Sequence, residues 1–198
     1  LHVDNANPAV VATYPQEAEA VLRSLVRHCT SGNVLALGLE SADPTVANAN
    51  NLNSTSEQAL DAIRAINRIG GVVGASGLPE LLPGLNFIVG LEGETGNSLR
   101  MNEELLRTVL AEGLLLRRVN VRQVIPVRRN FPRTVDHSDF VRFKEMVRRE
   151  IDTDAAKDGA PGKGPEEGVH RAEGRQHHLR PPDRQLPGRY IVSTSRKG

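Results

Sequence analysis

Short apolar runs alternate with longer stretches of helical periodicity along most of the chain. The runs Asn33–Glu40 and Leu85–Val89 are rich in strand-forming residues, and each leads through a turn into a helical pattern. A buried strand, a turn and an amphipathic helix together form the unit of parallel-sheet proteins. A strand end at Leu1–Asp4 and a strand at Arg117–Pro126 complete the pattern, which predicts four βα units.

The expected helices are marked by apolar residues at i, i+3, i+4 and i+7 spacing. The first is predicted to begin at Thr13, with Gln16 completing a capping box, and to place Cys29 on its buried face as a packing residue. The second is predicted to begin near Thr55 and to stop at Gly70. The remaining two are predicted to follow Thr95, ending at Gly113, and to start between Asp136 and Ser138.

Four βα units with short turns predict an α/β fold with a parallel sheet and right-handed crossovers. Such a sheet either curves as part of a barrel or lies open as a doubly wound sheet. Residues 70–84 are too rich in Gly and Pro for a helix, and we interpret them as an excursion before the strand at Leu85. Residues 153–198 contain 7 Gly and 5 Pro without apolar periodicity, so we predict a core over 1–152 and a disordered tail over 153–198.

Composition narrows the class of protein. The chain has 198 residues, of which 38% are hydrophobic and 25% charged, as in a soluble domain with a tail. No apolar run approaches the ~20 residues of a membrane span, and we expect a cytoplasmic protein without membrane contact. The single cysteine excludes an internal disulfide and an all-cysteine metal site. The net charge of +1 does not by itself indicate a nucleic-acid partner.

Candidate chemistry lies where the predicted strands end. Glu40 and Ser41 follow one strand, and Gly90 to Thr95 follow the next. Ligands of parallel sheets bind beyond the carboxyl ends of the strands, and glycine lets a ligand approach the backbone closely. For the segment Gly90 to Thr95 a second interpretation is equally open, namely a tight turn with solvated carboxylates and no ligand. Glu40, similarly, either faces a ligand or only caps the next segment.

Three segments carry a resemblance to a known family. Gly38–Pro44, GLESADP, resembles the fourth-strand motif of methylthiotransferase-like radical SAM proteins. Asn86–Thr95 resembles the fifth-strand motif G-F-I-x-G-L-P-G-E-T, with Asn86 in place of Gly and Glu92 in place of Pro. Val121–Pro126 is similar to the sixth strand, and residues 1–152 are also similar to uncharacterised archaeal radical SAM proteins.

The resemblance implies a partial (β/α)6 barrel that binds S-adenosylmethionine and a [4Fe–4S] cluster. The full-length enzyme would cleave S-adenosylmethionine reductively to a 5′-deoxyadenosyl radical. Glu94 would hold the turn. By the resemblance, Glu40 and Ser41 would lie near the ribose or amino-acid part of the cofactor, the backbone of Ile88, Val89 and Gly90 would flank the adenine, and Val124, Ile125 and Pro126 would lie alongside.

Two departures from the family bear on activity. The cluster cysteines, spaced C-x-x-x-C-x-x-C, are absent, and Cys29 alone cannot hold an iron–sulfur cluster. We therefore interpret the chain as an inactive fragment of a radical SAM enzyme, with no catalytic or metal-binding residue of its own and the cysteine segment upstream of Leu1. Residues 153–198 do not resemble the β-rich domain of related proteins, and their composition is what a shifted reading frame would produce.

Alternatives from other classes remain. The chain can be a non-catalytic remnant or interaction module that binds RNA or a protein through its basic tail. A barrel lyase or aldolase fragment would need a lysine at a strand end, but Lys144, on the last helix, is the only lysine of residues 1–152. His177 and His178 are a weak candidate metal pair. An exposed sheet edge near Leu1–Asp4 predicts self-association, and the substrate, a small molecule or RNA, is not specified.

Overall fold

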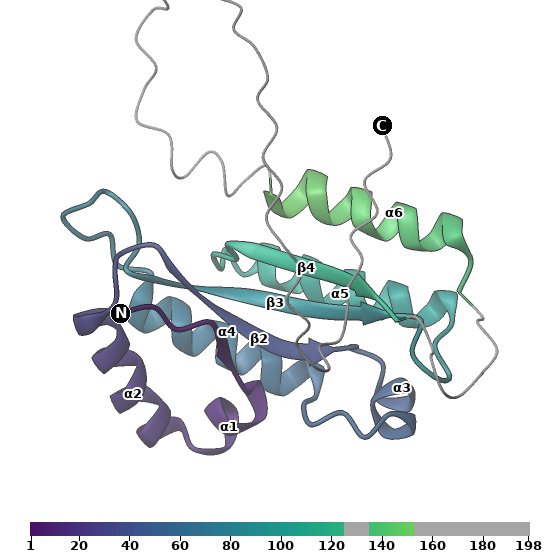
Figure 1. The fold of residues 1–198 in the computed structure, drawn as a ribbon, viewed down its shortest axis with the longest axis horizontal. Helices are drawn as coiled ribbons and strands as arrows, with labels where there is room; N and C mark the ends of the chain where they lie inside the picture. The colour runs from purple at the N-terminus through teal and green to yellow at the C-terminus, as the bar shows by residue number, and fades with distance from the viewer. Residues whose placement is uncertain (125–134, 153–198) are drawn as a thin grey trace, which may run out of the picture. The chain divides into compact units, whose positions relative to one another are not determined.

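The computed structural model describes residues 1–124 and 135–152. Their centre is one parallel sheet in which the strands lie side by side in chain order, β1-β2-β3-β4 (Figure 1). The tail over 153–198, which was predicted to be disordered, lies outside the described residues together with His177 and His178. The strands are β1 (Asn5–Ala6), β2 (Asn33–Glu40), β3 (Leu81–Val89) and β4 (Arg118–Gln123).

Helices connect these strands and follow the last of them. The helix predicted to begin near Thr55 starts there with a capping box: the Thr55 hydroxyl accepts the Gln58 N–H at 3.3 Å, and the Gln58 side chain accepts the Thr55 N–H at 3.0 Å. None of the helices within 1–124 and 135–152 combines the length and apolar character needed to cross a bilayer. The helices are α1 (Pro8–Thr13), α2 (Pro15–His28), α3 (Pro44–Ala49), α4 (Ser56–Gly70), α5 (Gly96–Ala111) and α6 (His137–Val147), which continues into a π-helical turn, η1 (Arg148–Asp152).

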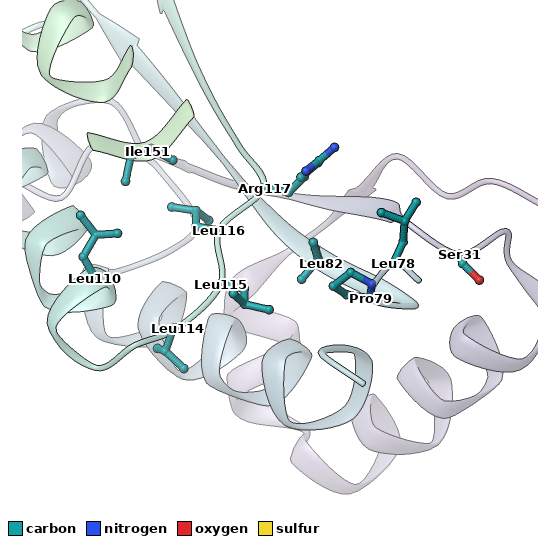
Figure 2. A pocket seen from close by; sticks show the side chains of 11 residues that line it. Ser31, Leu78, Pro79, Leu82, Leu110, Leu114, Leu115, Leu116, Arg117 and Ile151 are labelled. Carbon is teal, nitrogen blue, oxygen red and sulfur yellow. The ribbon is translucent and has the colours of Figure 1, made fainter. Parts of the chain in front are cut away.

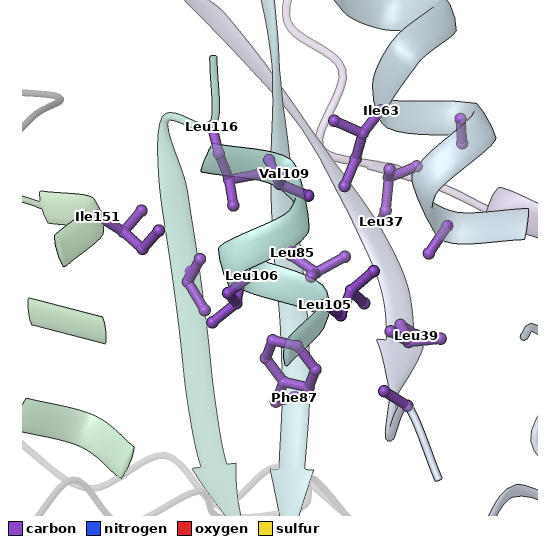
Figure 3. Packing of buried hydrophobic residues seen from close by; sticks show 14 of the residues in the cluster. Leu37, Leu39, Ile63, Leu85, Phe87, Leu105, Leu106, Val109, Leu116 and Ile151 are labelled. Atoms are coloured by element: carbon purple, nitrogen blue, oxygen red, sulfur yellow. The ribbon is translucent and has the colours of Figure 1, made fainter. Parts of the chain in front are cut away.

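The sheet buries one face against α4, α5 and α6 (Figure 3). Leu37 and Leu39 of β2 and Phe87 of β3 belong to the same buried cluster as residues of these helices. Phe87 meets Phe143 of α6 edge-on, with ring centroids 5.6 Å apart. Because side chains alternate along a strand, the residues between them point to the opposite face.

This arrangement decides between the two predicted sheet types. A doubly wound sheet reverses its strand order part-way and carries helices on both faces. Here the order is sequential, and right-handed crossovers of sequential strands place their helices on the same face. The described residues therefore form a segment of a (β/α) barrel wall, and the predicted α/β class with about four parallel strands is confirmed.

The N-terminal prediction is wrong in detail. Thr13 ends a short helix, α1, instead of starting a long one, and Tyr14 is the N-cap of α2 without a side-chain hydrogen bond. The Asn7–Pro8 pair marks the start of α1: the Asn7 side chain accepts the Ala9 N–H at 2.9 Å, and Pro8 is the first helical residue. Cys29, predicted on the buried face, lies after α2 as its C-cap and is only partly buried.

Two strand boundaries also differ. β1 comprises Asn5–Ala6 and not residues 1–4, although the Asp4 carbonyl accepts the Ala36 N–H at 2.9 Å. β3 begins at Leu81, inside the predicted excursion. Burial of the apolar residues around Pro83 outweighs the low strand propensity of proline. The Pro83 carbonyl accepts a hydrogen bond from the Arg117 N–H at 2.9 Å.

Candidate functional site

The candidate site is the edge of the sheet where β2, β3 and β4 end. The strands are parallel, so the loops after them share this edge. Glu40 pairs with Phe87, and Val89 pairs with Gln123. The segments that carry the family resemblance are therefore neighbours in space as well as successive in sequence.

Glu40 ends β2 in an unusual conformation. Its φ is 69°, in the left-handed region that residues other than glycine rarely adopt, and the pairing of β2 with β3 shifts between Gly38 and Glu40. A Cβ built on Gly38 would lie 3.1 Å from Oε1 of Glu40, so the carboxylate folds over Gly38 on the helix-free face. Burial raises the pKa of Glu40, and the positive charge of Arg122 opposes that rise.

The turn after β3 is closed by Glu94. Gly90 has φ 92° and Gly93 has φ 80°, which glycine adopts at little cost. The Glu94 side chain is 1% exposed, and its carboxylate accepts the Gly90 N–H. Burial raises the pKa of Glu94 to about 7, opposed by hydrogen bonds from the Gly90 and Leu91 N–H groups and reinforced by the charge of Asp43. The prediction that Glu94 holds the turn is confirmed.

Buried polar side chains fix the two loops to each other. Asp43 accepts a 2.6 Å hydrogen bond from the Ser98 hydroxyl of α5. Burial acts to raise the pKa of Asp43, but hydrogen bonds from Ser98 and from the start of α3 hold it below its usual value. Asn102 of α5 accepts the Ala42 N–H at 2.7 Å. Together these contacts position the loop after β2 against the helix that follows β3.

Asn50 joins the end of α3 to the turn after β3. Its side-chain NH₂ donates to the Glu92 carbonyl at 2.9 Å, and its oxygen accepts the Glu92 N–H at 3.2 Å. The same NH₂ group donates to the Val46 carbonyl at 2.8 Å, so Asn50 also caps the end of α3. The Asp43–Pro44 pair supplies the N-cap and the first residue of that helix.

The site residues predicted from the sequence differ in their burial and in the face of the sheet to which they point. Ser41 is 1% exposed and its hydroxyl accepts the Asp43 N–H at 3.2 Å, so it serves the loop and not the open face. Val89 is buried in the core, and its carbonyl accepts the Val124 N–H at 2.8 Å. Ile88, which lies between Phe87 and Val89, faces the helix-free side and is half-buried. Ile125 and Pro126 lie outside the described residues.

A polar row on β4 also faces the helix-free side. Val119 and Val121 belong to or pack against the core cluster, so the alternate residues Arg118, Asn120 and Arg122 point away from the helices. Asn120 Nδ2 donates to Asn86 Oδ1 of β3 at 2.8 Å. Alternation along the sequence is enough to place these β4 residues on one face of their strand, but it does not reveal that they share that face with Glu40.

The other end of the sheet holds an apolar cavity of about 160 Å³. Leucines near the start of β3, at the end of α5 and before β4 line it, together with Ile151 and Arg117 (Figure 2). Cys29 lies before β2, also at the amino end of the strands. The amino end of a (β/α) barrel ordinarily serves stability, so neither feature belongs to the candidate site.

The chain does not fit an iron–sulfur cluster by itself. It has one cysteine, at the end of the sheet opposite the candidate site. Within residues 1–124 and 135–152 no group of three His, Cys, Asp or Glu side chains is placed to hold a metal ion. Any cluster that works with this site needs thiolates from outside this chain.

The chain is similar to two archaeal proteins. It is 43% identical over 171 residues to an uncharacterised protein from Methanocaldococcus jannaschii, covering 81% of this chain and 31% of that protein. It is 41% identical over 164 residues to an uncharacterised protein from Archaeoglobus fulgidus, with 79% and 31% covered. The chain thus spans about a third of the length of the curated relatives it matches. No family model matches it.

Two solved structures show a limited likeness. One is TsrM, a radical S-adenosylmethionine methyltransferase from Kitasatospora setae, with TM-score 0.41 and 15% identity over 68% of this chain and 21% of that one. The other is coproporphyrinogen III oxidase from Escherichia coli, a radical SAM enzyme, with TM-score 0.41 and 15% identity over 80% of this chain and 32% of that one. A likeness of this extent assigns neither chemistry nor ligand to the chain.

Proposed function

We propose that this chain is part of a radical SAM enzyme and forms the portion of its barrel that binds S-adenosylmethionine. One observation carries the proposal. The Gly38–Pro44 and Asn86–Thr95 segments, which resemble the family's fourth- and fifth-strand motifs, end adjacent parallel strands of a sequentially ordered sheet. Ligands of such sheets bind at that edge.

The residues at this edge suit the cofactor. The Glu40 carboxylate can accept hydrogen bonds from ribose hydroxyls or from the ammonium group of the amino-acid part. Ile88 offers apolar surface to the adenine on the same face, and Gly90 leaves room beside it. Because Glu94 occupies the Gly90 N–H, the turn keeps its shape without a ligand. Bound S-adenosylmethionine would supply the 5′-deoxyadenosyl radical in the parent enzyme, at a cluster held by other residues.

The competing proposals have less support. A lyase or aldolase would need a lysine at a strand end, whereas the one lysine among residues 1–152 is Lys144 on α6. The interaction module depends on the tail, which lies outside the described residues. Neither proposal accounts for the left-handed conformation of Glu40 at the strand end, a kind of strain that concentrates at functional sites.

The test begins with the gene and its upstream reading frame. We expect an in-frame C-x-x-x-C-x-x-C segment, and we expect the extended protein, reconstituted with iron and sulfide without oxygen and then reduced, to form 5′-deoxyadenosine. Glu40→Gln in that protein should weaken S-adenosylmethionine binding. The 198-residue chain alone should take up no cluster. An upstream frame without the cysteines, together with no product, would reject the proposal.

A further inference from the structure

The helix-free face of the sheet carries charge in a defined pattern. Strand pairing sets Gly84 beside Arg118, Asn86 beside Asn120, and Ile88 beside Arg122. Leu37, Leu39, Phe87 and Val89 point to the helices, so the residues that alternate with them line the other face. Two arginines and an asparagine pair therefore lie on one side of the sheet, with Glu40 at its carboxyl edge.

The two arginines differ in their surroundings. Arg122 lies close enough to Glu40 for its charge to oppose the rise in the Glu40 pKa. Arg118, four residues earlier on β4, is exposed and has no ion-pair partner among the described residues. The positive charge of this face is thus balanced at the edge and unbalanced deeper along β4.

The asparagine pair adds hydrogen-bond donors between the arginines. Asn120 Nδ2 donates to Asn86 Oδ1, which leaves the Asn86 NH₂ group without a partner in residues 1–124 and 135–152. Arg118 and Arg122 are about 13 Å apart along the strand at their Cα atoms. Their long side chains can both reach over Asn120, where they and the Asn86 NH₂ would surround one acceptor group.

We propose that this row binds the anionic group of a small organic ligand, a carboxylate or a phosphate, over Asn120. Guanidinium groups match such anions in shape and charge, and the unbalanced charge of Arg118 makes the face complementary to a negative group. If this ligand is the substrate of the enzyme proposed above, it would bind closer to the start of β4 than the cofactor at Glu40. Its role as substrate rests on the proposed function, whereas anion binding by this row does not.

The experiment titrates inorganic phosphate and, separately, succinate into the full chain and follows the arginine Nε–Hε signals and backbone amides by NMR. We expect the Arg118 and Arg122 side-chain signals and the amides near Asn86 to shift in a saturable manner with at least one probe. Comparison of the two probes distinguishes a phosphate from a carboxylate ligand. Arg118→Gln should weaken binding by about tenfold, since a charged hydrogen-bond donor is lost.

Arg107→Gln is the matched control, because Arg107 is an exposed arginine on α5, away from the helix-free face. It should leave the affinity unchanged. Saturable shifts that survive Arg118→Gln, shifts confined to arginines of 153–198, or no shift at Arg118 would each overturn the inference. Binding of S-adenosylmethionine at Gly90 is measured in the same samples, so that its failure counts against the proposed function and not against the anion site.

Discussion

Glu94 is expected to make the stability of the chain fall as pH rises through neutrality. Its carboxyl has a pKa of about 7 in the folded chain, mainly because it is buried, against an ordinary pKa of 4.5 when it is exposed to water. In the unfolded chain it loses its proton first. Stability from this group is therefore fully present below pH 4.5 and is lost as pH rises through 7.

The size of the effect follows from the two pKa values. Each pH unit between them lowers the free energy of unfolding by about 1.4 kcal/mol, which amounts to about 3 kcal/mol across the window. Glu94→Gln keeps an acceptor for the Gly90 N–H and removes the titration. The loss of stability between pH 5 and pH 8 should then largely disappear.

Urea unfolding of the full chain at several pH values measures this difference. Glu104→Gln, at an exposed position on helix α5, which follows the turn that holds Glu94, is the control and should follow the wild-type pH dependence. The comparison is between the slopes of the free energy of unfolding against pH. A destabilisation by the glutamine NH₂ group that is the same at every pH does not change these slopes. Parallel pH curves for wild type and Glu94→Gln would refute the reasoning.

Three further substitutions test the packing around the site. Asn67→Ala should lower the free energy of unfolding by about 1–3 kcal/mol, because its side-chain amide donates to the Leu115 carbonyl and accepts the Leu115 N–H, which ties α4 to the segment before β4; an unchanged urea midpoint would contradict this. Phe87→Ala should cost about 3–5 kcal/mol, since the ring is fully buried against Phe143; a loss below about 1 kcal/mol would contradict the core. Asn50→Ala should speed amide hydrogen exchange at Glu92, which loses its acceptor, and an unchanged rate would argue against that contact.

Strand runs and helix caps could be predicted because they depend on local chemistry. The apolar run of β2 and the Thr55 capping box specify their elements without help from distant residues. The start of β3 could not be found in this way, since Pro83 and Gly84 have low strand propensity and are held by pairing with β2 and β4. Tertiary burial there outweighs propensity.

The candidate site was predictable in position but not in detail. Strand ends with Glu40 and Gly90 indicated the edge, because parallel strands place their carboxyl ends together. The backbone conformation of Glu40 and the burial of Ser41 depend on the register shift in β2 and on Asp43, which local patterns do not reveal. The approach of Arg122 to Glu40 spans two strand pairings, so it too required the structure.

The most direct test of the account is to map S-adenosylmethionine binding on the full chain by NMR. We predict saturable shifts in the amides of Gly38 to Ser41 and of Ile88 to Gly90, weakened by Gly90→Val, whose β-branched side chain is strained at φ 92°. Shifts confined to the leucine cavity at the amino end of the strands, or no shifts at any ligand concentration, would contradict the assignment of the carboxyl edge as the cofactor site.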